Sequence, residues 1–313
     1  MHVINSLLPV FVLIILGKWL SRIGFISNEF GKGLNRLTYW IALPSLLLDK
    51  VSGAVFDFGG VTILSLLLIS VTILSVLVAY LVAVVLKLDA RSMGAFVQGA
   101  ARSNNAFIGL PVILYSMSRL SPDVASLATV ALAPAIVFYN ALSVCILLAH
   151  SDRQAQTRAQ TTMIFIKQLF TNPLLLACVI GLLMNYFQLR FPVAIQHSLS
   201  ALGDTALALA LISIGAGLSF KGIFKGIRIS LSASMIKVVV QPLIGLGAAF
   251  FCDLSPIERQ ILLIYLACPT ATASYVLADI FNSDRNLAAN IIVVSTLLSA
   301  VTLSIIVAFG GSL

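Results

Sequence analysis

Hydrophobic runs of roughly twenty residues follow one another along nearly the whole chain, separated by short polar stretches. A helix of that length crosses the hydrocarbon layer of a bilayer. The pattern predicts helices over residues 3–21, 34–52, 61–86, 92–118, 124–149, 168–187, 195–219, 229–252, 256–281 and 286–309. We therefore expect an all-α membrane protein with ten transmembrane helices.

Two of these runs contain polar residues and proline in the middle, at corresponding places in the two halves of the chain. The first reads QGAARSNNAFIGLPVILY (98–115) and the second LLIYLACPTATASYVLADIF (262–281). Irregular backbone at membrane depth survives only where protein or a water-filled cavity supplies hydrogen-bond partners. Broken helices in matching positions of two repeats are typical of the substrate site of a secondary transporter. The sequence predicts that helices 4 and 9 are broken and together form such a site.

A polar linker at residues 151–167 separates five predicted helices (1–150) from five others (168–313). An odd number of helices in each half predicts inverted repeats. The Lys/Arg bias sets orientation: with the N-terminus outside, 13 basic residues lie at inner helix ends and 4 at outer ends. Both termini are then outside, and the 150–167 loop is cytoplasmic.

Composition excludes several function classes. The chain is 60% hydrophobic and 10% charged, and its formal charge of +8 is explained by loop topology rather than by nucleic-acid binding. The three histidines lie near span ends, and no zinc-protease or phosphate-loop motif is present. We predict no enzyme activity, no metal site and no cofactor; an intramembrane enzyme and a primary pump are the alternatives that this disfavours.

The polar residues of helix 4 follow from its proline. Pro111 cannot donate to the carbonyl of Phe107, and Gly109 lowers the cost of an unwound turn. The freed backbone groups need partners. Side chains that can supply them, or bind a ligand instead, are Ser103, Asn104 and Asn105.

Arg102 places a permanent charge inside the same span. An Arg at the centre of a helix costs roughly 2.5–3.5 kcal/mol on insertion scales. This cost indicates either a structural partner, such as Asp279, or an anionic ligand. Asn140 in helix 5 either faces broken helix 4 or forms a helix-to-helix hydrogen bond.

Predicted helix 9, like helix 4, contains a proline followed by polar residues. Pro269 frees the carbonyl of Tyr265, and Thr270, Thr272 and Ser274 follow directly. The N-terminus of a half-helix presents free amides that suit a carboxylate. The alternative is a simple proline kink whose hydroxyls bond to the preceding turn. Two such spans in matching positions favour a site.

Lys237 in helix 8 either balances charge near the broken helices or pairs with Asp204 or reaches the membrane surface. In helix 10, Ser295 and Thr296 are interpreted as packing residues.

The segment QGAARSNNAFIGLPV resembles the helix 4 signature of the auxin efflux carrier family in its bacterial form. TNPLLLACVIGLLMN is similar to the family's Asn-Pro opening of the second half, and MIKVVVQPLIG to its helix 8 pattern. The stretch ACPTATASYVLADIF is similar to a crossover helix of the related bile acid/sodium symporters. Where many members have Gly-Asn-Thr-Gly, residues 103–106 here read Ser-Asn-Asn-Ala.

The resemblance implies two inverted five-helix repeats in which helices 4 and 9 cross at their breaks. Helices 1, 2, 6 and 7 would form a scaffold, and helices 3–5 and 8–10 a transport domain. The crossover residues map onto Asn104, Pro111 and Pro269. Family substrates are organic anions: auxin in plants, and malate, malonate or similar carboxylates in bacteria. A homodimer through the scaffold is a further implication.

We therefore predict a secondary carrier of a small organic anion in a bacterial inner membrane, working by an elevator-type movement. Asn104, Asn105 and Thr270 would bind the ligand, and Arg102 or Lys237 would tune the charge. The alternatives are a sodium-coupled symporter of the bile-acid type and an anion channel or sensor. Coupling to protons or sodium stays open.

Overall fold

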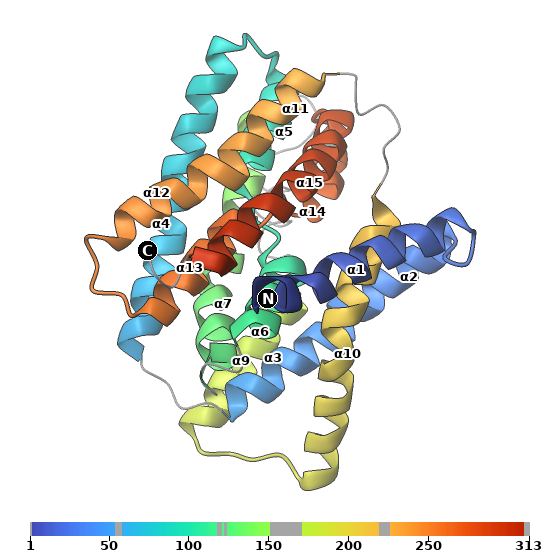
Figure 1. Ribbon diagram of the computed structural model, residues 1–313, viewed down its shortest axis with the longest axis vertical. Helices are drawn as coiled ribbons and strands as arrows, with labels where there is room; N and C mark the ends of the chain where they lie inside the picture. Colours follow the sequence, from blue (N-terminus) through green and yellow to red (C-terminus); the bar gives the residue numbers. More distant parts are fainter. Residues whose placement is uncertain are drawn as a thin grey trace. The chain divides into compact units, whose positions relative to one another are not determined.

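The structure is a computed structural model that describes residues 2–53, 58–117, 121, 124–150, 171–218 and 226–309. Within these residues every regular element is helical (Figure 1). The predicted linker at 151–167 lies outside them. The chain divides into two compact units, residues 1–62, 106–136 and 169–218 on one side and residues 63–105, 137–168 and 219–313 on the other. Each unit is described by itself.

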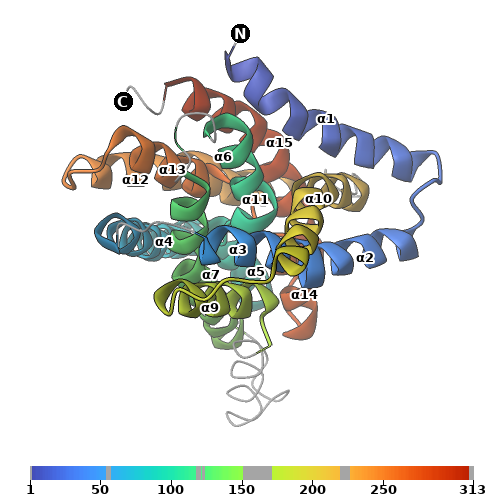
Figure 2. The same ribbon diagram turned by 90° about the horizontal axis from the view of Figure 1, so that it is seen from below.

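The first unit is a helical layer built around α10. Its elements are α1 (His2–Arg22), α2 (Asn28–Leu37), η1 (Thr38–Ala42), α3 (Leu43–Ser52), α6 (Leu110–Met117), the first half of α7 (Val124–Ala149), α9 (Pro173–Tyr186) and α10 (Val193–Gly217). Helix α10 contacts α1, α2 and α3, and α9 packs on α3 (Figure 2). The element η1 is a single π-helical turn that joins α2 to α3.

The second unit is centred on α15. It contains most of α4 (Phe58–Val85), α5 (Ala90–Ala101), the second half of α7, α11 (Ile227–Met235), η3 (Ile236–Val240), α12 (Gln241–Ala249), α13 (Pro256–Ala267), α14 (Ala273–Ile280) and α15 (Arg285–Phe309). Helix α15 contacts α5, α11, α13 and α14. A core of small and branched side chains, including Ala79, Phe96 and Ile291, joins α4, α5 and α15. Small residues let these helices approach closely, as membrane helices do.

Five described helical runs are long and apolar enough to cross a membrane. They are Gly59–Val85, Val124–Ala149, Val193–Gly217, Ile227–Ala249 and Arg285–Phe309. Asn105–Met117 and Pro173–Tyr186 are shorter apolar helices. The all-helical membrane class predicted from sequence is confirmed. The arrangement as ten spans in two inverted repeats stays a prediction.

Three π-helical turns each precede a proline by the same spacing. η1 ends two residues before Pro44, η2 (Asn105–Gly109) two before Pro111, and η3 two before Pro242. Proline has no amide, and its ring clashes with the carbonyl four residues back. In all three cases that carbonyl belongs to the middle of the π turn, where the wider coil relieves the clash. Proline therefore sets where each helix loosens.

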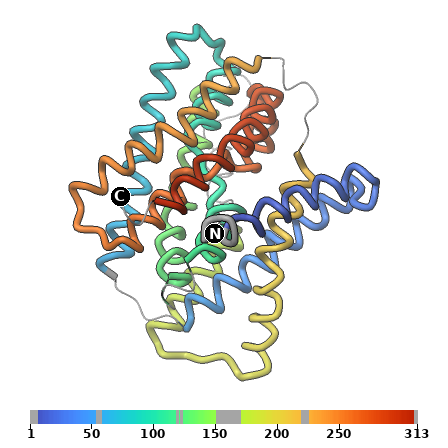
Figure 3. Tube along the Cα trace, viewed as in Figure 1, coloured from blue at the N-terminus to red at the C-terminus, as the bar shows by residue number. Residues whose placement is uncertain are grey.

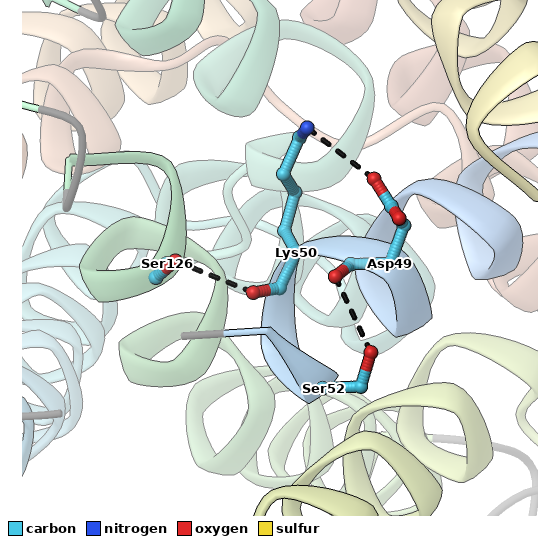
Figure 4. A network of polar contacts seen from close by, with 4 residues as sticks. All are labelled: Asp49, Lys50, Ser52 and Ser126. Carbon is cyan, nitrogen blue, oxygen red and sulfur yellow. Dashed lines mark hydrogen bonds and ion pairs between the residues drawn. The ribbon is translucent and has the colours of Figure 1, made fainter. Parts of the chain in front are cut away.

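A polar cluster ties the end of α3 to its neighbours in the first unit. Ser126 Oγ donates to the Lys50 carbonyl at 3.3 Å, and Ser52 Oγ to the Asp49 carbonyl at 3.4 Å (Figure 4). Arg190 Nη1 donates to the Ser52 carbonyl at 3.2 Å, as does Asn185 Nδ2 at the same distance. These donors satisfy carbonyls that a helix C-terminus leaves open, and Arg190 adds a favourable charge there.

Helices α1 and α10 pack backbone to backbone through glycine. A Cβ on Gly215 would overlap the Ile14 carbonyl, and one on Gly17 would overlap the Ile212 carbonyl. Because lipid offers no hydrophobic drive for association, such close van der Waals packing stabilises helix pairs in membranes.

We expect Gly215→Ala to destabilise the protein by about 1–3 kcal/mol, because the added methyl forces two helix backbones apart. Gly217→Ala is the matched control, since a Cβ there meets no described atom within 4 Å. Thermal unfolding in detergent measures both. Equal melting temperatures for the two variants would contradict the proposed importance of the α1–α10 contact.

Candidate functional site

Helix α5 ends where the sequence places its polar residues. The helix stops at Ala101, and Arg102 adopts an extended conformation with φ −82° and ψ 113°. Asn105 then begins η2. Helix 4 is therefore broken, but at Arg102, Ser103 and Asn104; the predicted position at Gly109 and Pro111 was wrong, because those residues continue as the helical elements η2 and α6.

The second break lies between α13 and α14. Helix α13 stops at Ala267, Cys268 is extended with φ −56° and ψ 144°, and α14 begins at Ala273. Pro269 lies inside the break, so it supplies no amide to the helix that ends there. The break predicted in helix 9 is also present.

The two breaks pair with each other as a short antiparallel ladder in the second unit. The Asn104 amide donates to the Pro269 carbonyl at 2.8 Å, and the Ala271 amide donates to the Arg102 carbonyl at 3.0 Å. Ser103 lies opposite Thr270 in this β-bridge. Backbone groups that neither helix could satisfy alone are satisfied across the contact, as burial at membrane depth requires. We call residues 102–104 and 268–272 the paired breaks.

Side chains satisfy the helix-end carbonyls beside the paired breaks. Thr270 Oγ1 donates to the Gly99 carbonyl at 2.6 Å, and Gln241 Nε2 to the Ala101 carbonyl at 3.4 Å. The Thr270 amide donates to Ser295 Oγ at 3.0 Å. Thr270 is thus a structural link between α5 and α15. Ser295, interpreted from sequence as a packing residue, also has a polar structural role, because its hydroxyl accepts this freed backbone amide.

Lys237 is fully buried in η3. Its Nζ donates to the Leu266 carbonyl at 2.7 Å, at the C-terminal end of α13. In an unbroken helix that carbonyl would accept from the amide of Thr270, which here bonds to Ser295 instead. A cation at a helix C-terminus also meets the negative end of the dipole. Lys237 does not reach the membrane surface, and Asp204, one of its predicted partners, is exposed.

Arg102 bonds to Asn140 of α7. Arg102 Nη2 donates to Asn140 Oδ1 at 2.6 Å. The proposed alternative partner, Asp279, instead pairs with Arg285 at 3.2 Å on the exposed end of α14. Arg102 also lines a crevice that is too narrow for a water molecule. The other residues of this crevice are Thr72, Gln98, Ala101, Tyr139, Leu142, Ser143 and Ile146.

Several buried polar atoms around the paired breaks have no hydrogen-bond partner within the described part of the protein. They are Ser103 Oγ, Asn104 Nδ2, Ser274 Oγ, Gln98 Oε1 and Gln241 Oε1. Asn105 lies near the Tyr139 hydroxyl, outside hydrogen-bond geometry. Buried polar groups in native proteins are almost always paired, so a cluster of exceptions in one place needs an explanation.

The structure brings most of the predicted site residues together and separates others. Arg102, Ser103, Asn104, Asn105, Asn140, Thr270, Ser274, Pro269 and Lys237 all belong to the second unit. Thr272 is the N-cap residue of α14 and is partly exposed. Its side chain makes no capping hydrogen bond. Gly109 and Pro111 belong to the first unit, at the end of η2 and the start of α6.

Sequence reasoning missed Gln98, Gln241, Thr72 and Tyr139. All four are buried, and each carries a polar group within an apolar run. Gln98 Nε2 donates to the Ser274 carbonyl at 3.2 Å, and Gln241 Nε2 to Thr72 Oγ1 at 3.2 Å. An amide inside a membrane span was the available signal, because its burial requires partners.

A second polar region joins the N-terminal ends of α5 and α15. The recess has a volume of about 500 Å³ and is lined by Asp89, Arg91, Ser92, Asp279, Asn282, Ser283, Asp284, Arg285 and Asn286. Arg91 Nε donates to the Asn282 carbonyl at 2.8 Å, and Asp284 caps α15. Asp89 caps α5, and its hydrogen bond with the Ser92 side chain holds the pKa of Asp89 below its ordinary value. The hydrogen bonds of this region connect the ends of neighbouring helices.

Comparison with known proteins points to membrane transport. A family described as membrane transport protein matches residues 2–307. An uncharacterized transporter of Methanothermobacter thermautotrophicus is 27% identical over 96% of this chain and 95% of its own. A transporter of Methanocaldococcus jannaschii, also named uncharacterized, is 23% identical over 96% of each chain. A Rhizobium meliloti protein with the name "Putative malonate transporter" is 24% identical over 97% of this chain and 94% of its own.

The hydroxyl of Thr270 offers a direct test of the paired breaks. We expect Thr270→Val to destabilise the protein by about 1–3 kcal/mol, because it leaves the buried Gly99 carbonyl without a donor. Thr296→Val is the control: Thr296 is also buried, but among the described residues its hydroxyl bonds only to the Ile292 carbonyl of its own helix. Thermal unfolding of both variants in one detergent measures the difference, and equal losses would argue against a special role for Thr270.

Proposed function

Because the chain belongs to the membrane transport protein family, the auxin efflux carrier family that its helix 4 segment resembles, we propose that it is a secondary carrier of a small organic anion. It is a membrane transporter and not an enzyme. The proposed substrate class is a carboxylate of the size of malonate or malate. The name of the Rhizobium meliloti relative supports this choice.

The antiparallel pairing of two broken helices is the observation that carries the proposal. It gathers hydroxyl and amide groups of Ser103, Asn104 and Ser274, which have no partner among the described residues, next to the partly buried guanidinium of Arg102. Neutral donors and one fixed positive charge suit a carboxylate, which accepts several hydrogen bonds. Half-helices with open ends are where secondary carriers bind substrates. Asn105, Asn140 and Thr272 complete the proposed binding set, and Thr270 supports it.

Thr270 contributes mainly by position. Its amide and hydroxyl are both engaged, so it holds the break open rather than donating to a ligand. Arg102, whose Nη2 is bonded to Asn140, is oriented by that bond. The crevice beside Arg102 is too narrow for a substrate, so substrate entry requires the surrounding side chains to move.

Lys237 is proposed to take the place of a coupling cation. In secondary transporters, half-helix C-terminal ends and unwound carbonyls bind sodium. Here the Lys237 ammonium already donates a hydrogen bond to such a carbonyl, that of Leu266. A charge that is part of the chain moves with the protein and needs no bulk sodium. This favours a sodium-independent carrier over the symporter of the bile-acid type.

The remaining parts of the proposal concern architecture. We propose ten spans in two inverted repeats, residues 1–150 and 168–313, with a scaffold from helices 1, 2, 6 and 7. Helices 3–5 and 8–10 would form the transport domain and move in an elevator-type cycle. Placement in a bacterial inner membrane with both termini outside, and a homodimer through the scaffold, belong to the same proposal.

Counterflow in proteoliposomes tests the function. Proteoliposomes loaded with unlabelled malonate should accumulate labelled malonate. Asn104→Ala should lower the initial rate of this uptake at least tenfold by removing a buried ligand donor. Ser299→Ala is the control, because that buried hydroxyl bonds only to the Thr296 carbonyl. Labelled malate and an aromatic acetic acid extend the panel. Absence of counterflow with every anion would end the carrier proposal.

Replacing sodium by choline on both sides tests the proposed role of Lys237. We expect unchanged malonate counterflow and no accumulation driven by a sodium gradient. If a sodium gradient does drive uphill uptake while counterflow persists, the carrier proposal stands and the fixed-cation proposal is wrong.

A further inference from the structure

The tip of the α1–α2 hairpin has a surface unlike a water-facing loop. Helix α1 ends at Arg22, and the chain turns at Gly24, whose φ is +80° (Figure 3). Ser27 then caps α2 by accepting from the Phe30 amide. The turn is therefore a defined structure, with Ile26 buried beneath it.

Large apolar side chains are exposed around this tip. Phe25 is 72% exposed and Phe30 55%. The other exposed members are Trp19, Ile23 and Leu37. Soluble surfaces rarely gather so many aromatic and branched residues, whereas aromatic residues concentrate where a membrane meets water.

Helix α2 separates its apolar and basic residues onto opposite faces. At 3.6 residues per turn, Phe30, Leu34 and Leu37 share one face, and Lys32 and Arg36 lie on the other. No residue of α2 is buried, although α2 contacts α10. A basic polar face opposite an exposed apolar face is typical of helices that lie at a lipid interface.

The tip carries more basic than acidic side chains. Arg22, Lys32 and Arg36 are exposed, and Glu29 is the one acidic residue between positions 18 and 37. Lys18 is turned inward and donates to the Leu218 carbonyl, so it is not part of this surface. The Lys/Arg bias predicts that this end of the helices faces the cytoplasm, where anionic lipids attract basic segments.

We propose that the hairpin tip binds the headgroup of an anionic phospholipid through Arg22, Lys32 and Arg36, with Phe25 and Phe30 set into the acyl boundary. The site uses three exposed cations on the two helices that the capped turn joins, which is more than the positive-inside rule requires. That rule acts during insertion, whereas this site acts on the folded protein. The inference is independent of what the protein transports.

Purified protein in a neutral detergent tests the proposal. Phosphatidylglycerol, phosphatidylcholine and soluble glycerol phosphate are titrated separately, with retained lipid counted by native mass spectrometry and stability followed by thermal unfolding. We expect phosphatidylglycerol to be retained and to raise the melting temperature, and the other two compounds to do neither. The double variant K32Q/R36Q should bind phosphatidylglycerol at least tenfold more weakly, since each basic residue near an anionic surface contributes roughly fivefold.

The control variant K87Q/R228Q removes the same charge from exposed positions outside the hairpin. It should retain phosphatidylglycerol like the unaltered protein. Equal weakening in both double variants would show diffuse charge attraction and overturn the site. Stabilisation by glycerol phosphate alone would also overturn it, because the ligand would then be a free phosphate. Retention of phosphatidylcholine equal to that of phosphatidylglycerol would do the same.

Discussion

The backbone pairing between Arg102–Asn104 and Pro269–Ala271 is the constraint on which the second unit depends. A helix broken inside a membrane leaves amides and carbonyls that lipid cannot satisfy. Here each break supplies what the other lacks, through two backbone bonds of 2.8 and 3.0 Å. Without its partner each break would leave buried backbone groups without hydrogen bonds, so the two breaks must form together. That mutual dependence explains why polar residues collect at this one place.

Around this pairing, side chains divide into those that complete the fold and those left available. Thr270, Gln241 and Lys237 each donate to a carbonyl at the end of α5 or α13. By contrast, Ser103 Oγ and Asn104 Nδ2 have no partner among the described residues. The first group makes the breaks permanent features of the folded protein. The second group gives a solute something to bind, because polar groups buried without partners favour any ligand that can pair with them.

Proline has a second role beyond the paired breaks. Pro44, Pro111 and Pro242 each follow a π-helical turn at the same distance. The turn before Pro242 holds Lys237, which places the ammonium at the end of α13. A wider turn shifts the positions of all later side chains around the helix axis. The proline thereby helps to determine which face of the helix carries the charge.

The sequence by itself determined the helical membrane class and the approximate helix positions, because apolar length acts locally. It also placed the break of helix 9 at Pro269, but it placed that of helix 4 at Gly109 and Pro111, whereas the structure breaks helix 4 at residues 102–104. Asn104, Thr270 and Lys237 could be singled out because polar groups within apolar runs need partners. Only the tertiary structure decided what those partners are. Thr270 donates to the Gly99 carbonyl and Lys237 to the Leu266 carbonyl, and Arg102 bonds to Asn140 rather than Asp279. Gln98 and Gln241 passed unnoticed for the same reason. Hydrogen bonds between residues far apart in the chain depend on which helix faces meet, and hydrophobic periodicity carries no information about that choice.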